Sequence, residues 1–202
     1  MKTRTGNEFI DLKDIGGVGG RADGQYGWMT YFGRFFSNKN ILDVGAGLGL
    51  SRGRLGVNGN NVTLQDTAPN LPVDIKEEIF AIDDNSYDIV TCFDVIEHIP
   101  EDYPFLKKMY DISKEGVVIS TPNFMVTKCK NPYHIREYTP KELYDLCGNF
   151  TSDLTFWLTS DNTGSDARIV NEEEFLDEEP ELPLVYPQTD RQSLGVFLKK
   201  LE

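Results

Sequence analysis

Apolar runs bounded by turn residues recur along the chain and predict a series of buried strands. Six runs are long enough for this interpretation: 40–44, 62–65, 87–93, 116–121, 154–158 and 194–198. Continuous apolar runs of this length are typical of strands covered on both faces of a sheet. A further short strand is expected near 79–82.

Several segments between these runs repeat their apolar side chains at helical spacing. A helix is expected over 26–36 and another over 101–113. The helix that follows the first strand is predicted to be weak, because Gly53 and Gly56 each cost about 1 kcal/mol relative to Ala. The glycine-rich residues 1–24 are expected to form a loop or a flexible arm.

The clearest helix start lies at residues 139–142, which read Thr-Pro-Lys-Glu. Thr at the N-cap and Glu at the third helical position form a capping box, and Pro suits the first helical position. This helix is expected to end at Gly148.

Strands that alternate with helices and end in a hairpin predict a doubly wound α/β sheet in a single domain spanning 1–202. No helix pattern separates the two late runs, so we expect them to pair antiparallel at one sheet edge. The segment between them, 160–190, is expected to be an acidic loop.

Composition narrows the class of protein. The chain has 202 residues, 39% of them hydrophobic, and no apolar run approaches the length of a membrane span. Its first residues lack the apolar stretch of a secretory signal. The three cysteines (Cys92, Cys129 and Cys147) fit no metal-binding spacing, and reduced thiols in a cytoplasmic protein are expected. With only two histidines, no metal site is expected.

The net charge of −13 bears on possible partners. Seven acids and no base lie within 171–181, and the rest of the chain still carries −6. A broad surface for binding nucleic acid is therefore not expected, since its affinity depends on Lys and Arg. Binding of RNA or DNA through one local basic patch remains open. Two interpretations of the acidic stretch remain open: a solvated loop, or a contact for a cationic acceptor or a basic partner.

The first strand ends in the pattern Asp43-x-Gly45-x-Gly47-x-Gly49. Glycines at alternate positions allow a ligand to lie against the backbone. The dinucleotide pattern G-x-G-x-x-G is absent, which disfavours an NAD-dependent oxidoreductase. The next strand ends at Asp66, where a carboxylate is placed to bind ribose hydroxyls. These features predict a site for a nucleoside cofactor.

The acid followed by G-x-G-x-G resembles the first motif of the class I S-adenosylmethionine (SAM) dependent methyltransferases. A second stretch, 84–88, reads Asp-Asn-Ser-Tyr-Asp, and 94–98 reads Asp-Val-Ile-Glu-His. Both are similar to the small-molecule branch of that family, which includes ubiquinone, menaquinone and sugar methyltransferases. The resemblance covers 38–125 well and 126–202 more loosely. It implies a Rossmann-like, seven-stranded sheet, mostly parallel with a terminal antiparallel strand.

The resemblance also implies the residues that bind SAM. The three glycines would let the methionine part of SAM lie against the backbone. Asp43 would lie near the ammonium group of SAM or its ordered waters, and Asp66 would accept hydrogen bonds from both ribose hydroxyls. Other members of the family bind the adenine with an acid and an apolar residue, which correspond here to Asp74 and Ile75, with Glu77 and Glu78 as rivals for the acid. A short segment after the fourth strand of the family lines the cofactor pocket and corresponds here to Phe93, Asp94 and Val95.

Two histidines are candidates for removing a proton from the methyl acceptor. His98 follows the fourth strand of the family and has a pKa suited to a general base; alternatively, Glu97 and His98 only orient the loop. His134 lies in 131–139, which resembles the H-x-R-x-Y/F-T segment of sugar methyltransferases.

For the residues around His134, two interpretations remain open. Tyr133, His134, Arg136 and Tyr138 line an acceptor pocket, or Arg136 and Glu137 form a solvated ion pair. On the helix expected at 26–36, Tyr26 and Trp28 either cover the site as a lid or pack in the core.

The function implied is methyl transfer from SAM to an oxygen, or a nitrogen, of a small molecule or glycan. The alternative is a non-catalytic protein that binds SAM or S-adenosylhomocysteine (SAH) as a partner or regulator. Residues 94–97 lack the Asn/Asp-Pro-Pro-Tyr pattern, which disfavours amino-methylation of nucleic-acid bases.

Overall fold

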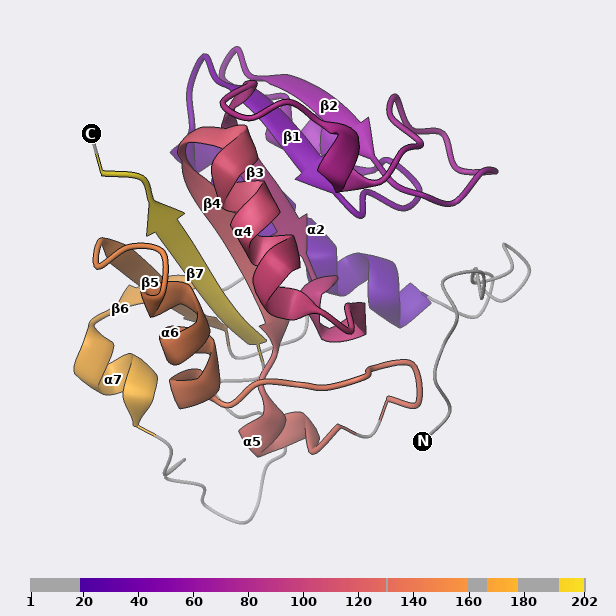
Figure 1. Cartoon of the computed structure of the whole chain (residues 1–202). Coiled ribbons are helices and arrows are strands. Elements are labelled where there is room, and N and C mark those ends of the chain that lie inside the picture. The colour runs from indigo at the N-terminus through magenta and orange to yellow at the C-terminus, as the bar shows by residue number, and fades with distance from the viewer. Residues whose placement is uncertain (1–18, 130, 160–166, 178–192, 202) are drawn as a thin grey trace.

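The computed structural model describes residues 19–129, 131–159, 167–177 and 193–201, with side chains from residue 27. Seven strands form one sheet in the order β2-β1-β3-β4-β7-β5-β6 (Figure 1). The strands are β1 (Asn40–Val44), β2 (Asn61–Gln65), β3 (Tyr87–Phe93), β4 (Ser113–Pro122), β5 (Leu154–Thr159), β6 (Arg168–Val170) and β7 (Ser193–Lys199). The helices are α2 (Gly19–Phe35), α3 (Ser51–Leu55), η1 (Ile79–Ala81), η2 (Ile96–His98), α4 (Asp102–Ile112), α5 (Phe124–Thr127), α6 (Pro140–Gly148) and α7 (Glu172–Leu176).

Strand pairing confirms the predicted fold class. β1 pairs parallel with β2 and β3, and β3 pairs parallel with β4. β7 runs antiparallel to both β4 and β5, and β6 is antiparallel to β5. Five of the seven strands, β1 to β5, therefore run in one direction, and β6 and β7 run opposite to them. The carboxyl ends of β1 to β4 share one edge of the sheet, where ligands bind in open α/β folds.

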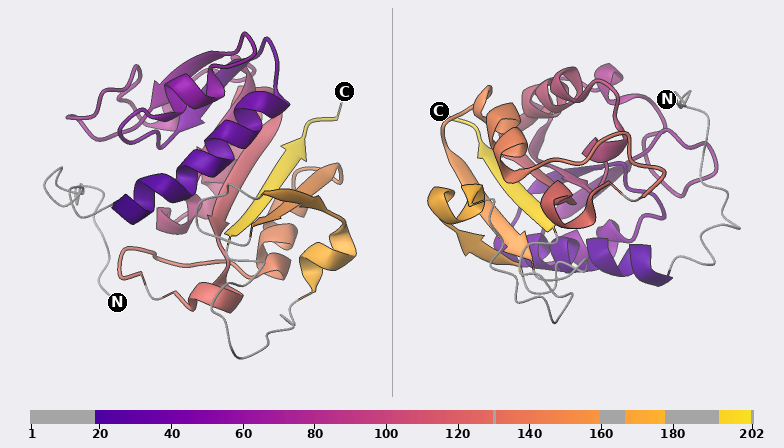
Figure 2. Two further views of the ribbon diagram at one scale, coloured as in Figure 1. Left: turned by 180° about the vertical axis from the view of Figure 1, so that it is seen from behind. Right: turned by 90° about the horizontal axis from the view of Figure 1, so that it is seen from below.

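Helices cover both faces of the sheet, because neighbouring strand residues point to opposite sides. Ile41 packs with Trp28 and Phe32 of α2, whereas Leu42 packs on the other face with Leu106 of α4. The left view of Figure 2, seen from behind, shows α2 lying across the face of the sheet opposite to α4. Trp28 is fully buried, so it packs in the core and does not form a lid.

Several predicted elements have the expected bounds. α4 and β1 to β3 match the prediction within two residues, and α6 begins with the predicted capping box. The oxygen of the Thr139 side chain accepts a hydrogen bond from the backbone of Glu142, whose carboxylate accepts one from the backbone of Thr139. Among the described helices, none is long and apolar enough to cross a membrane.

Three predictions about the helices and strands need correction. Residues 79–82 do not form a strand, since Ile79–Ala81 is a turn of 3-10 helix with Ile79 buried in the core. Residues 19–24 are helical rather than part of a flexible arm, because α2 begins at Gly19. The late strands do pair antiparallel, but away from the sheet edge, since β7 lies between β4 and β5.

The prediction of an acidic loop over 160–190 is also partly wrong. Within its described residues, 167–177, the chain forms strand β6 and helix α7. Asn171 caps α7 by accepting a hydrogen bond from the backbone of Glu174, and Phe175 is fully buried against Phe156, with ring centroids 4.5 Å apart. The apolar anchor fixes the acidic helix to the sheet. The other residues of 160–190 lie outside the described parts of the chain.

Candidate functional site

The glycine turn after β1 has a backbone that only glycine adopts readily. Gly45, Gly47 and Gly49 have positive φ values of 72°, 53° and 75°. A Cβ at Gly45 would lie 2.5 Å from a methyl carbon of Val95, whereas a Cβ at Gly47 would meet nothing within 4 Å. The turn is thus closely packed on one side and open over Gly47.

Asp66 lies directly beyond the end of β2 and faces this turn. Its Oδ2 accepts a hydrogen bond from the backbone N–H of Gly47 at 3.0 Å, and its Oδ1 accepts one from Ala68 at 3.0 Å. The carboxylate is therefore held beside the open position of the turn, where it retains lone pairs for further donors.

Asp43 is a buried acid in β1, two residues before the turn. The hydroxyl of Thr91 donates to its Oδ1 at 2.7 Å. Burial raises the pKa of Asp43 from 3.8 to about 6, against the lowering effect of its hydrogen bonds. The nearby Ser51 side chain is fully buried, and its hydroxyl is one of the groups that lower this pKa. Buried polar groups beside the turn suit a polar ligand.

The two residues expected at the adenine lie after β2. Asp74 is half exposed and accepts two hydrogen bonds from Arg52, at 2.8 and 2.7 Å, and one from the backbone of Leu64. The Leu64 bond is the main cause that lowers its pKa. Ile75 packs partly buried against the core and forms a bridge with Gln65. The backbone carbonyl of Glu77, one of the rival residues, accepts a hydrogen bond from the side chain of Gln65.

The segment after β3 connects the glycine turn to the histidines. Phe93 is buried in the core, Asp94 has a left-handed φ of 52°, and Val95 packs against Gly45. The hydroxyl of Ser120 donates to Asp94 at 2.9 Å. Burial raises the pKa of Asp94 to about 6. Left-handed conformations are uncommon outside glycine and occur often at functional sites.

Glu97 is fully buried in the turn that follows. The Thr121 hydroxyl donates to its Oε2 at 3.2 Å, while its Oε1 has no hydrogen-bond partner. Burial, and next the charge of Asp94, raise the pKa of Glu97 well above its usual range. The backbone carbonyl of Glu97 accepts from the N–H groups of Ile135 and Arg136, which attaches the loop containing His134.

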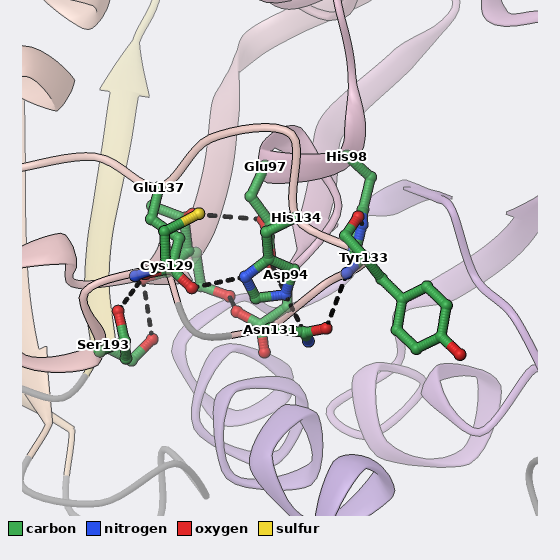
Figure 3. A network of polar contacts seen from close by, with 12 residues as sticks. Asp94, Glu97, His98, Cys129, Asn131, Tyr133, His134, Glu137 and Ser193 are labelled. Carbon is green, nitrogen blue, oxygen red and sulfur yellow. Dashed lines mark hydrogen bonds and ion pairs between the residues drawn. The ribbon is translucent and has the colours of Figure 1, made fainter. Parts of the chain in front are cut away.

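The structure brings the two candidate histidines together. Their ring centroids lie 4.8 Å apart, with the rings nearly perpendicular (Figure 3). The Nδ1 atom of His98 contacts the carbonyl of Tyr133 at 2.9 Å. The Nδ1 atom of His134 contacts Glu137 at 2.5 Å, and its Nε2 contacts the amide nitrogen of Asn131 at 2.9 Å. These contacts fix both ring orientations.

Glu137 is the site residue whose role the sequence did not predict. A solvated pair with Arg136 is wrong: Glu137 is buried on His134, Thr127 and the backbone of Cys129, while Arg136 pairs with Asp102. The one available signal was its spacing, three residues after His134.

The expected acceptor-pocket residues separate into two environments. Tyr138 is buried and donates to Asp102 at 2.9 Å, whereas Tyr133 is 43% exposed. The three cysteines are free thiols, with Cys92 and Cys147 buried and Cys129 partly buried.

Comparison with known proteins identifies the family of this chain. Residues 27–150 match the family described as a methyltransferase domain. The chain is 30% identical over 116 residues to a ubiquinone biosynthesis O-methyltransferase of Bordetella parapertussis, covering 48% of each chain. The chain therefore spans about half the length of the relatives that it matches.

Two solved structures share the fold across nearly the whole chain. A SAM-dependent methyltransferase from Archaeoglobus fulgidus superposes with a TM-score of 0.67 at 18% identity, covering 94% of this chain and 98% of that one. The plantazolicin methyltransferase BpumL in complex with a triazolic desmethylPZN analogue and SAH gives a TM-score of 0.59 at 16% identity, covering 95% of this chain and 90% of that one. At these identities the likeness concerns the fold.

Proposed function

Because this chain belongs to the methyltransferase domain family, with the class I SAM-dependent fold, we propose that it transfers a methyl group to an oxygen of a small molecule or glycan. A nitrogen acceptor is the less favoured form of the same proposal. SAM, the cofactor of this family, supplies an electrophilic methyl group on an activated leaving group. Placement of the acceptor therefore contributes much of the rate.

The cofactor half of the site consists of the turn at Gly45, Gly47 and Gly49 together with Asp43 and Asp66. Open space over Gly47 and the carboxylate fixed beside it support a bound nucleoside. In this proposal Asp66 accepts the ribose hydroxyls and Asp43 binds near the ammonium group.

The remaining cofactor contacts in the proposal come from the next segments of the same edge. Phe93, Asp94 and Val95 line the pocket, and Val95 already packs against the turn. Asp74 and Ile75 lie near the adenine. Because Asp74 is already bonded to Arg52, its part would be to fix the segment through that ion pair.

The acceptor half consists of His98 and His134, and their pairing is the observation that carries the catalytic proposal. Glu137 and the Tyr133 carbonyl each hold one Nδ1 atom, which favours the tautomers with Nε2 unprotonated. An unprotonated imidazole nitrogen accepts a proton from a hydroxyl as the methyl group is transferred. The contact of Val95 with Gly45 brings this half next to the cofactor half.

Two observations support a small acceptor. One relative is named for O-methylation in ubiquinone biosynthesis, although it matches over about half its length. The chain carries a net charge of −13, which opposes binding to nucleic-acid phosphates.

The three free thiols support a reducing compartment such as the cytoplasm.

The test has two stages. Calorimetry measures binding of SAM and SAH, and a coupled assay then measures SAH release over a panel of phenols, sugar alcohols and amines. We expect binding of both ligands and SAH release with at least one hydroxyl acceptor. Asp66→Asn should weaken SAM binding, and Asp83→Asn, on an exposed turn, is its control.

The alternative function is a non-catalytic protein that binds SAM or SAH as a partner or regulator. The glycine turn supports this alternative equally, because it concerns the cofactor only. Tight SAM binding without SAH release for any acceptor on the panel would favour it over the enzyme. Absence of SAM binding would overturn both.

A further inference from the structure

Three side chains at the acceptor half converge as metal ligands do. Glu97, His98 and His134 each present one ligand atom, and these atoms all lie within 4.8 Å of one another. Glu97 and His98 come from the turn after β3, whereas His134 comes from the loop between α5 and α6 (Figure 3). The count of two histidines in the sequence had argued against such a site, but both of them meet here.

The unpaired oxygen of Glu97 is a second, independent observation. Glu97 is 0% exposed, and its Oε1 accepts no hydrogen bond. This atom lies 3.9 Å from the Nε2 of His134, so it faces the cluster. Burying a polar atom without a hydrogen-bond partner destabilises the folded state, and a cation bound between these side chains would remove that cost.

The contacts behind the cluster have the arrangement seen around metal-binding histidines. Such histidines donate the N–H that does not bind the metal to a carboxylate or a backbone carbonyl. Here the Nδ1 of His134 contacts the carboxylate of Glu137, and the Nδ1 of His98 contacts the carbonyl of Tyr133. The Nε2 atoms of the two rings are the candidate ligands, and the one of His134 now contacts Asn131.

We propose that Glu97 Oε1 and the Nε2 atoms of His98 and His134 bind one divalent transition-metal ion. Two imidazoles and one carboxylate favour ions such as Zn²⁺, Co²⁺ or Fe²⁺ over Mg²⁺ and Ca²⁺, which prefer ligand sets made of oxygen. Asn131 would move away from His134 when the ion binds. Asp94 lies close enough for its charge to act on Glu97 and forms the acidic border of the site.

The site deepens the proposed function and rests on it for its role. A metal ion lowers the pKa of a hydroxyl that coordinates it, so the acceptor would lose its proton to solvent rather than to an imidazole. The acceptor oxygen then forms the bond to the methyl carbon as the carbon–sulfur bond breaks. The two histidines would thus act as ligands and not as general bases.

The experiment titrates Co²⁺ into the tag-free protein and follows the visible absorption of the bound ion. We expect saturation at one equivalent, with competition by Zn²⁺ and little competition by Mg²⁺. His98→Ala, His134→Ala and Glu97→Gln should each abolish the saturable absorption. Glu137→Gln should weaken Co²⁺ binding by about 10–100-fold, as expected for a residue that orients a ligand.

Two controls separate loss of the site from loss of the fold. The double variant Glu172→Gln, Glu173→Gln removes acids from α7, far from the cluster in sequence, and should bind Co²⁺ as the wild type does. SAM binding by each variant, measured calorimetrically, reports whether the sheet and the glycine turn remain folded.

The outcomes distinguish the metal site from the proposed function. Absence of saturable Co²⁺ binding, or equal binding by the ligand variants that still bind SAM, would overturn the metal site. SAH release that persists in a chelator would overturn its catalytic role and leave the proposed function intact. One equivalent of Co²⁺ with no SAM binding would support the site while overturning the proposed function.

Discussion

The cofactor half of the site lies at the ends of β1 and β2, whereas the acceptor half lies on the segments after β3 and β4. The first is shaped by backbone: three glycines with positive φ and one carboxylate that fixes their turn. The second is a network of buried side chains, in which Glu137 holds His134 and Thr121 holds Glu97.

This difference shows how one sheet edge supports two kinds of recognition. Glycine conformation within a short stretch determines the cofactor half, so its shape depends little on distant residues. The acceptor half depends on attachment of one loop to another, through the Glu97 carbonyl and the Ile135 N–H. Substitutions in the two halves should therefore affect different measurements.

The largest expected effect separates catalysis from cofactor binding. His98→Gln and His134→Gln should each lower the rate of SAH release by roughly 100-fold or more, since the histidines either accept the proton of the acceptor or bind the metal ion that lowers its pKa. The Kd for SAM should remain close to that of the wild type. Coupled assays and calorimetry measure the two quantities.

The matched control for these variants is Lys141→Ala. Lys141 lies exposed on α6, where it pairs with Asp145 and contacts the ring of Tyr144, so the rate should not change. A histidine variant that weakened SAM binding as much as turnover would show that the two halves are not separable.

Gly45→Ala should disturb the cofactor half. The added Cβ would lie 2.5 Å from Val95 at a φ of 72°, so left-handed strain and overpacking together should lower the free energy of unfolding by about 2–4 kcal/mol. Urea denaturation measures the change.

Gly53→Ala is the control for that substitution. A Cβ at Gly53, within α3, meets nothing within 4 Å, so stability should rise by about 0.5–1 kcal/mol. Equal destabilisation by both variants would contradict the assigned role of the Val95 contact.

The pH dependence of stability tests the buried acid of the cofactor half. Because the pKa of Asp43 is raised from 3.8 to about 6, the folded state binds more protons than the unfolded state between these values. The free energy of unfolding should therefore fall as pH rises through this window, by up to about 3 kcal/mol from this one group.

Asp43→Asn should remove that part of the slope, and Asp83→Asn, on an exposed turn, should retain it. Urea denaturation at several pH values across the window measures both variants. The interpretation fails if the Asp43→Asn curve has the same slope as the wild type.

The smallest expected effect concerns the anchor of the acceptor loop. Thr139 accepts a hydrogen bond from the backbone of Glu142 at 3.2 Å and begins α6. Thr139→Ala should lower the free energy of unfolding by about 1 kcal/mol, and Thr139→Ser should restore most of it. A thermal or urea melt measures the difference, and a loss confined to SAM binding would contradict the assignment.

Elements with strong local signals were predicted from the sequence, and weaker ones were not. The capping box at Thr139 and the buried run of β3 had the expected bounds. The prediction of a strand near 79–82 was wrong because a short apolar run does not distinguish a strand from a helical turn. The helix α7 was missed because three acids precede its two apolar residues, Phe175 and Leu176, which are too few to show a helical period.

The sequence by itself determined the glycine turn and the acid at the tip of β2, because both depend on neighbours along the chain and on backbone conformation. Tertiary structure alone decided that Glu97, His98 and His134 meet, and that Glu137 is buried on His134. Residues separated by more than thirty positions come together only when β3 and β4 align and their following loops bond to each other. No local sequence pattern encodes the proximity of these side chains, since it depends on the packing of the whole sheet.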